Sequence, residues 1–135
     1  MKNILFDTNA YIRFVAGDEK IMAEIERVDQ ISISMSVVVL GELYAGYRGG
    51  EKEQQNKIIL NKFIETSDVS ILGVSQVTAD YYGRIKSTLK KTGRPIPSND
   101  IWIAAQALET GSVLVTYDTH FLAVPGLRVW DELRD

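Results

Sequence analysis

Short apolar runs alternate along this chain with segments of helical periodicity, and this alternation constrains the fold more than any other feature. Four runs have the composition of strands: NILF at 3–6, QISIS at 30–34, DVSIL at 68–72 and SVLVT at 112–116. A further run, LRVW at 127–130, is a candidate fifth strand. The alternation predicts an α/β fold with a central parallel sheet of four to five strands and helices on both faces.

Capping and breaking residues mark the ends of the predicted helices. Ser36 and Ser75 each precede a helical pattern, and Ser98 is placed to cap the helix over residues 99–110. Gly111 is placed to end that helix. In the helices that begin near Glu51 and at Ser75, we expect these apolar residues to face inward: Ile58, Ile59, Phe63, Ile64, Val77, Tyr81, Ile85 and Leu89.

The composition is typical of one globular domain over residues 1–135, with 45% hydrophobic and 24% charged residues. No apolar run approaches the ~18 residues that cross a bilayer, so we expect no membrane association and a cytoplasmic protein. The sequence has no cysteine, and His120 is its only histidine, which excludes disulfides and a histidine-rich zinc site. A bound metal would therefore be held mainly by oxygen ligands.

Four carboxylates fall at positions that a parallel sheet brings together. Asp7 and Asp118 follow the first and the fourth predicted strands. Glu42 lies about two turns into the helix after the second strand, and Asp100 lies in the first turn of the helix at 99–110. Because ligands of open parallel sheets bind at the carboxyl ends of the strands, we expect the four side chains to converge at one edge of the sheet.

Each of these carboxylates also has an ordinary structural interpretation. Asp7 and Asp118 suit turns, and Asp100 complements the positive end of its helix. Glu42 suits such an interpretation least, because its neighbours in the sequence are almost all apolar. Two carboxylates about 4 Å apart repel by about 4 kcal/mol at an effective dielectric constant of ~20, so a cluster of four requires protons or a cation. Mg²⁺ held by carboxylates, water and a substrate phosphate meets that requirement.

Four short motifs and a C-terminal segment together resemble one known family. They are FDTN at 6–9, GELYAG at 41–46, NDIWIAA at 99–105 and LVTYDTHF at 114–121, followed by VPGLRVW at 124–130. In this order and in a chain of this size, the set is similar to the PIN-domain ribonucleases, specifically the VapC-type toxins of bacterial and archaeal toxin–antitoxin pairs. The resemblance implies a single PIN-like domain and hydrolysis of RNA phosphodiester bonds with Mg²⁺ or Mn²⁺.

The resemblance also implies which residues form the site. The family's acidic and polar motif positions fall on Asp7, Asn9, Glu42, Asp100, Thr116 and Asp118. Asp7 and Asp100 are expected to bind the metal most directly. Glu42 would complete the site or orient the attacking water. Asp118 would act together with Thr116, through water or a second ion.

A basic segment precedes the motif that carries Asp100. Residues 84–94 contain five cationic side chains and no acidic one, although the whole chain has a net charge of −3. The solvated face of a helix would explain such a segment as well. If the chain binds RNA, Lys90, Lys91 and Arg94 are the residues that we expect to hold the phosphate backbone.

A toxin of this family implies an antitoxin partner, and we also expect a homodimer. The expected docking surface is the apolar side of the two helices between Tyr11 and Val28, with about half of these residues in the core: Tyr11, Phe14, Ile21, Met22 and Ile25. A basic side chain of the antitoxin is expected to reach the acidic pocket. Two alternative functions stay open at this point: a PIN-fold nuclease of RNA processing that is not a toxin, and an RNA-binding module without catalysis.

Overall fold

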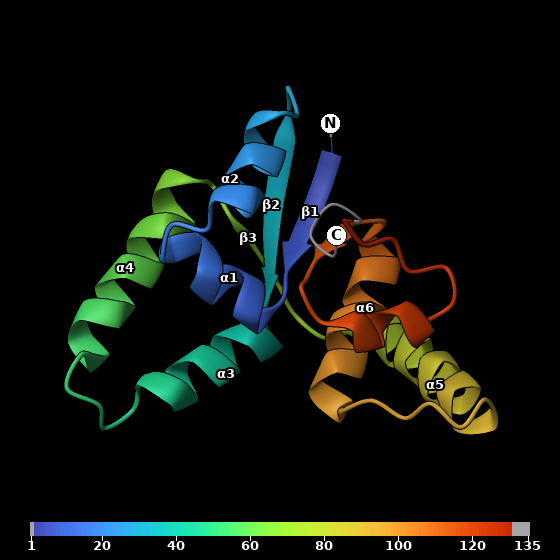
Figure 1. Ribbon diagram of the computed structural model, residues 1–135. Helices are drawn as coiled ribbons and strands as arrows, with labels where there is room; N and C mark the ends of the chain where they lie inside the picture. Colours follow the sequence, from blue (N-terminus) through green and yellow to red (C-terminus); the bar gives the residue numbers. More distant parts are fainter. Residues whose placement is uncertain (1, 131–135) are drawn as a thin grey trace.

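A computed structural model describes residues 2–130, and its strands form one parallel sheet (Figure 1). The strands are β1 (Lys2–Phe6), β2 (Ile31–Ser36), β3 (Ser70–Leu72) and β4 (Val113–Val115). They lie in the order β3-β2-β1-β4, so the first strand of the sequence is central. Every pairing is parallel, which confirms the predicted fold class.

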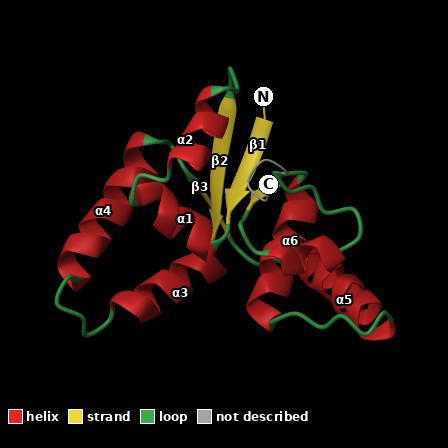
Figure 2. Cartoon of the chain, viewed as in Figure 1, coloured by secondary structure: helices red, strands yellow, loops and turns green. Residues whose placement is uncertain are grey.

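Helices cover both faces of this sheet. In Figures 1 and 2, α1, α2 and α4 lie on one side, α5 and α6 lie on the other, and α3 runs below the carboxyl ends of the strands. The helices are α1 (Thr8–Val15), α2 (Glu19–Glu26), α3 (Val37–Tyr47), α4 (Glu53–Thr66), α5 (Gln76–Lys91), α6 (Ser98–Thr110) and the 3₁₀ helix η1 (Thr119–Ala123). None of the helices within residues 2–130 combines the length and the hydropathy needed to span a bilayer.

The predicted fifth strand at residues 127–130 is reduced to a single bridge. Val129 forms one isolated parallel bridge with Leu114. The amide of Leu114 donates to the carbonyl of Arg128 at 2.8 Å, and the amide of Trp130 donates to the carbonyl of Leu114 at 3.3 Å. The sheet of the described residues therefore has four strands, because one bridge does not extend into a ladder.

Helix capping follows the sequence at two of the three serines. The Ser36 hydroxyl accepts from the amide of Val38 at 2.9 Å, and Ser75 forms a capping box with Thr78. The prediction for Ser98 is wrong, since Pro97 is the N-cap of α6 and Ser98 is its first helical residue. Pro97 has extended backbone angles, and its carbonyl accepts from the amides of Asp100 and Ile101 at 3.0 and 3.1 Å, so the helix begins one residue earlier than expected.

Aromatic side chains join α1 and α4 to the central strand. Phe6 of β1 stacks on Phe14 of α1, with ring centroids 5.4 Å apart. The ring of Phe63 on α4 lies 5.5 Å from the rings of both Tyr11 and Phe14. Tyr11 and Phe6 are fully buried, so these contacts fix how α4 is turned about its axis.

Three of the predicted inward-facing residues are in fact exposed. Ile58 and Ile59 are 63% and 41% exposed, because the packing of Phe63 turns Leu60 rather than these isoleucines toward the sheet. Val77 is 58% exposed at the start of α5. Residues spaced four apart on a helix drift by about 40° per step, so a stripe that is buried at Ile85 and Leu89 has rotated outward by Val77.

Candidate active site

The first carboxylate of the site is fixed by the end of β1. Asp7 follows Phe6 directly, and its amide donates to the carbonyl of Val115 on β4 at 3.2 Å. Its carboxylate caps α1, because Oδ1 accepts from the amide of Ala10 at 2.8 Å. Asp7 is only 5% exposed, so this end of the sheet holds a carboxyl group inside the protein.

Thr116 connects Asp7 to the motif that follows β4. Its hydroxyl donates to Oδ2 of Asp7 at 2.5 Å and accepts from the amide of Asp118 at 2.9 Å. Asp7 and Thr116 are 109 positions apart in the sequence, and the pairing of β1 with β4 brings them together. Thr116 is fully buried, so its hydroxyl is committed to these two contacts.

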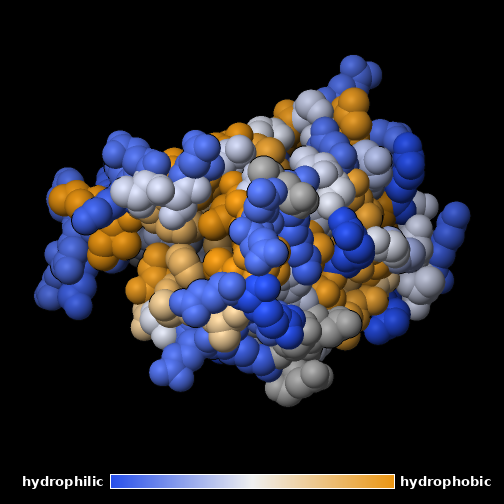
Figure 3. Space-filling view, turned by 90° about the horizontal axis from the view of Figure 1, so that it is seen from above, coloured by the Kyte–Doolittle hydropathy of each residue, from blue (hydrophilic) through white to orange (hydrophobic). Residues whose placement is uncertain are grey.

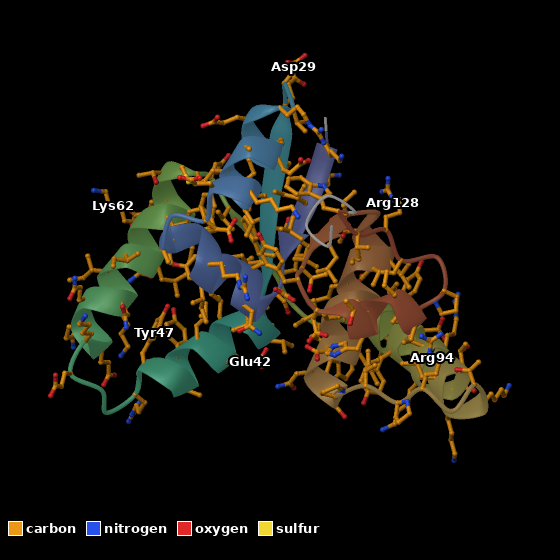
Figure 4. The ribbon with its side chains drawn as sticks, viewed as in Figure 1. Asp29, Glu42, Tyr47, Lys62, Arg94 and Arg128 are labelled. Atoms are coloured by element: carbon orange, nitrogen blue, oxygen red, sulfur yellow. The ribbon has the colours of Figure 1, made fainter. Side chains whose placement is uncertain are left out.

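Glu42 enters the site from α3. Figure 4 shows Glu42 on α3, below the carboxyl ends of the strands. The hydroxyl of Thr8, at the start of α1, donates to Oε1 of Glu42 at 2.8 Å. Glu42, which was the hardest of the four to explain as a surface carboxylate, is therefore half-buried at the sheet edge. It is oriented by Thr8, the residue next to Asp7.

A histidine lies between the two remaining carboxylates. Nε2 of His120 is 2.8 Å from Oδ2 of Asp100, and Nδ1 is 2.8 Å from Oδ1 of Asp118. Asp118 also caps η1 by accepting from the amide of His120 at 3.1 Å, which holds the imidazole beside it. Nε2 is buried and, despite its short distance to Asp100, lacks the alignment of a hydrogen bond, so the contact is better described as electrostatic.

Burial and mutual repulsion perturb two of the carboxylates. Burial raises the pKa of Asp7 above its usual value of 3.8, and the charges of Asp100 and Asp118 add to this effect, although the hydrogen bonds from Thr116 and Ala10 oppose it. Burial also raises the pKa of Asp100, with Glu42 and Asp118 raising it further and His120 lowering it. All four predicted carboxylates thus lie within electrostatic range of Asp100 or Asp7.

The donor set at this edge fits a divalent cation. Ligand atoms of Asp100, Asp118 and His120 lie within 4.8 Å of one another. Two carboxylates and an imidazole are suitable ligands for Mg²⁺ or Mn²⁺, with carboxylates preferred by the harder ion. The buried Nε2 without a hydrogen bond and the raised pKa of Asp100 both indicate a place where positive charge is needed. This geometry groups Asp118 with Asp100, whereas the sequence favoured Asp7 and Asp100 as the most direct ligands.

Of the remaining predicted residues, Asn9 lies beside this centre and the three basic residues lie farther away. Asn9 is exposed on the first turn of α1 and lines a cavity that also touches Asp118. Lys90 and Lys91 end α5, and Arg94 lies in the connection to α6, well separated from Glu42 in Figure 4. Within residues 2–130, these three cations form no ion pair. Whether they contact RNA remains a prediction.

His120 is the site residue that the sequence did not assign. It had served only to exclude a zinc site, although it stands two positions after Asp118 in the motif LVTYDTHF. That spacing is the available signal, since a polar side chain beside a motif carboxylate is a natural candidate for the same site. Its contact with Asp100 depends on the turn of η1 and cannot be read from spacing alone.

The fold is that of an α/β protein with a parallel sheet. Carboxylates from four separate segments meet at the carboxyl edge of this sheet and form an acidic centre suited to a cation. Residues 4–127 match the PIN domain family. The chain is 35% identical over 118 residues to ribonuclease VapC1 of Haemophilus influenzae strain R2866. The match covers 84% of this chain and 85% of that protein. The chain therefore belongs to the PIN-domain family and, within it, to the VapC proteins.

Solved structures agree with this assignment. The structure of VapBC-1 from nontypeable Haemophilus influenzae matches with a TM-score of 0.84 and 30% identity, over 98% of this chain and 99% of that chain. VapBC-5 from Mycobacterium tuberculosis, a member of the VapBC family of toxin–antitoxin systems, matches with a TM-score of 0.72 and 25% identity, over 96% and 97%. The predicted PIN-like fold and the resemblance to VapC toxins are thus confirmed.

Proposed function

We propose that this chain is the toxin of a toxin–antitoxin pair, an endoribonuclease that hydrolyses RNA phosphodiester bonds with Mg²⁺ or Mn²⁺. The observation that carries the proposal is the convergence of Asp7, Glu42, Asp100 and Asp118 from four segments onto one edge of the sheet, in a chain of the VapC family. The ribonuclease activity that VapC1 is named for supports the same conclusion.

The residues of the site have distinct roles in this proposal. Asp100, Asp118 and His120 hold the divalent ion, which when bound supplies positive charge to activate water and to stabilise the leaving oxygen. Asp7 stands beside them in an orientation fixed by Thr116 and the amide of Ala10.

Glu42 has the role of orienting the attacking water. Its Oε1 accepts from Thr8, and its second oxygen is left to accept a hydrogen bond from that water. Its charge raises the pKa of the Asp100 carboxyl, so the two carboxylates lie close enough to repel each other.

The experiment that tests the activity uses purified chain without any partner. RNA of mixed structure should be cleaved in Mg²⁺ or Mn²⁺, EDTA should stop the cleavage, and excess Mn²⁺ should restore it. Asp100→Asn should abolish cleavage, whereas Asp80→Asn, which changes an exposed carboxylate on α5, should not. Cleavage that persists in EDTA would refute the metal mechanism, and RNA binding without any cleavage would favour the non-catalytic module.

The part of the basic segment from Lys86 to Arg94 has a structural feature that supports RNA binding. Lys86 and Lys90 line a cavity of 260 Å³ whose walls are otherwise apolar, formed with Leu89, Pro95, Ile96 and Ile101. Ile101 directly follows Asp100, so this cavity and the acidic centre share the first turn of α6. In our proposal the RNA backbone passes over Lys90, Lys91 and Arg94 on its way to the acidic centre.

The antitoxin would dock on α1, α2 and α4. Of the five apolar residues expected there, Tyr11 and Ile21 are fully buried, Phe14 and Ile25 are half-buried, and Met22 is 41% exposed. The exposed isoleucines of α4, Ile58 and Ile59, add to this surface, and Figure 3 shows hydrophobic surface on the side of the molecule where α4 lies. Apolar contacts here would supply most of the affinity, and a basic side chain reaching the carboxylates would displace the metal.

A homodimer would use a different surface. Val37 and Val74 are exposed just beyond the carboxyl ends of β2 and β3, which are adjacent because Ser36 pairs with Leu72. Val77 at the start of α5 is also exposed.

Two variants separate the dimer surface from the antitoxin surface. Val77→Asp should lose dimer formation in light scattering and keep antitoxin binding in a pull-down. Ile58→Asp should lose antitoxin binding and keep the dimer. The opposite pattern would refute both assignments.

A further inference from the structure

A polar cavity adjoins the acidic centre on the side of α1. It has a volume of 260 Å³ and is lined by Asn9, Arg13, Tyr117, Asp118 and Thr119. Of the residues that group around the cation position, it touches only Asp118. A molecule in this cavity would therefore lie next to the reacting group rather than on it.

Arg13 gives the cavity a positive charge with unused hydrogen-bond donors. Its guanidinium carbon lies 4.4 Å from the centre of the Tyr117 ring, which is a stacking contact. Within residues 2–130, this guanidinium forms no ion pair and donates no hydrogen bond. Stacking on a ring face leaves the N–H groups at the edge of the guanidinium plane free, and their fork geometry matches two oxygens of a phosphate.

The ring under Arg13 is itself fixed in place. The hydroxyl of Tyr117 lies 3.0 Å from both carboxylate oxygens of Asp18, to which it donates. Asp18 is the N-cap of α2 and accepts from the amide of Ile21 at 3.0 Å. Burial acts to raise the pKa of Asp18, but the hydrogen bonds from the Ile21 amide, the Tyr117 hydroxyl and the Lys20 amide, together with the nearby charge of Arg13, outweigh it and lower the pKa. The acceptor is therefore ionised at neutral pH. The Arg13 guanidinium thus stacks on a Tyr117 ring that is held in place by its hydrogen bonds to the N-cap of α2.

We propose that this cavity binds a phosphate of the RNA backbone that neighbours the reacting phosphate, with Arg13 as its main ligand. Asn9 and Thr119 supply neutral donors on the same walls. Asp118 would repel the phosphate if its charge stood alone, so a divalent ion held by Asp100, Asp118 and His120 is expected to strengthen binding in the cavity. The inference rests on the proposed ribonuclease function, because RNA supplies a phosphate on either side of the one that reacts.

The chain offers a matched control for Arg13. Arg84 also lies over a tyrosine ring, at 5.2 Å from the centre of Tyr81, but it is on α5 and pairs with Asp80. Arg13→Gln and Arg84→Gln therefore remove the same charge from similar stacking contacts, one in the cavity and one away from it. Both arginines are exposed, so neither change threatens the fold.

The test measures binding of a fluorescent single-stranded RNA oligonucleotide in EDTA, as a function of NaCl concentration, followed by cleavage of the same RNA in Mn²⁺. Arg13→Gln should weaken binding about tenfold at low salt and reduce the slope of log K against log salt by about one. Its KM should rise more than its kcat falls. Tyr117→Leu should reproduce most of the loss with the charge retained, and Arg84→Gln should behave as wild type.

The outcomes separate this proposal from the proposed function. If the wild type cleaves RNA and Arg13→Gln binds and cleaves as well as Arg84→Gln does, the phosphate site is refuted and the nuclease stands. If the wild type binds RNA with an Arg13-dependent salt slope but cleaves nothing in Mn²⁺, phosphate binding in the cavity stands, whereas the nuclease, and with it the place next to a reacting phosphate, is refuted. If Arg13→Gln loses only binding of a protein partner, the cavity recognises an acidic side chain and the RNA assignment is refuted.

Discussion

At the scale of single residues, Asp7 combines two tasks that a surface aspartate does not have. It caps α1 through the amide of Ala10, and it accepts from the buried hydroxyl of Thr116. The first task stabilises the fold, whereas the buried charge opposes it, as the raised pKa of Asp7 indicates. Side chains in functional sites commonly combine a structural benefit with such an electrostatic cost.

This conflict predicts that Asp7→Asn stabilises the metal-free protein at neutral pH. Because the pKa of Asp7 is raised above 3.8 in the fold, the free energy of unfolding falls as the pH rises from 3.8 through the folded pKa, and it stays lower above that value. Asparagine removes this effect and still caps the helix. Urea unfolding in EDTA should show a higher midpoint than wild type at pH 7 and no such gain below pH 3.8.

Asp7→Ala is the control for the cap. It also removes the charge, but it loses the acceptor for Ala10 and should be about 1 kcal/mol less stable than Asp7→Asn. Equal stability of the two variants would mean that the cap contributes nothing. An Asp7→Asn variant less stable than wild type at pH 7 would mean that the buried charge is not unfavourable.

The sequence predicted most residues of the candidate site and their convergence at one edge of the sheet, but not the contacts among them. The four carboxylates and Thr116 were predicted from strand ends and from motifs, and the structure brings them to one edge. His120 escaped prediction, because its position between Asp100 and Asp118 follows from the turn of η1 and from the packing of α6. Periodicity and spacing report which element carries a side chain, whereas its distance to another element depends on tertiary packing.

At the scale of elements, the two ends of α6 differ in how they are determined. Its start is set by Pro97, and its end by Gly111, which has a positive φ of 68°. The left-handed conformation at a helix end is accessible to glycine without the steric penalty that a Cβ brings. Among residues 2–130, nothing beyond the adjoining backbone lies within 4 Å of the place where a Cβ would be added at Gly111, so the obstacle to a side chain there is this conformation.

Two glycine substitutions should therefore have opposite effects on stability. Gly111→Ala places a Cβ at positive φ and should cost about 1 kcal/mol. Gly83→Ala lies inside α5 with open space around the added Cβ, and it should stabilise the protein by up to about 1 kcal/mol through helix propensity. Midpoints of urea unfolding measure both changes, and a stabilised Gly111→Ala would show that the helix end tolerates another conformation.

The elements that the sequence misjudged share one physical cause. Ile58, Ile59 and Val77 lie on helices that carry more apolar residues than their buried faces can cover. The sequence shows that such a helix has more apolar residues than one face can bury, but the rotation about the helix axis is chosen by contacts such as Phe63 on Tyr11. The excess apolar residues then lie at the surface, where a partner protein is expected.

At the scale of the whole molecule, the proposed binding of a metal at the acidic centre would couple to stability. The four carboxylates repel one another in the metal-free fold, and a divalent ion removes that repulsion. Mn²⁺ at one hundred times its dissociation constant should raise the free energy of unfolding by about 2.7 kcal/mol. Asp100→Asn should lose most of this gain, and Asp80→Asn should keep it. A thermal melt without any shift on addition of Mn²⁺ would show that the centre does not bind the ion.

The pairing of β4 with β1 has a consequence for the cell that makes this protein. Asp7 leaves the ribosome before Thr116, Asp118 and His120, because Thr116 lies 109 positions after it in the sequence. At a rate of up to ~20 residues per second, about five seconds or more separate the translation of Asp7 from that of Asp118. Throughout this interval the nascent chain has no assembled centre, because the centre needs both Asp7 and the residues that follow β4. The acidic centre can therefore form only after β4 and the residues that follow it have been translated.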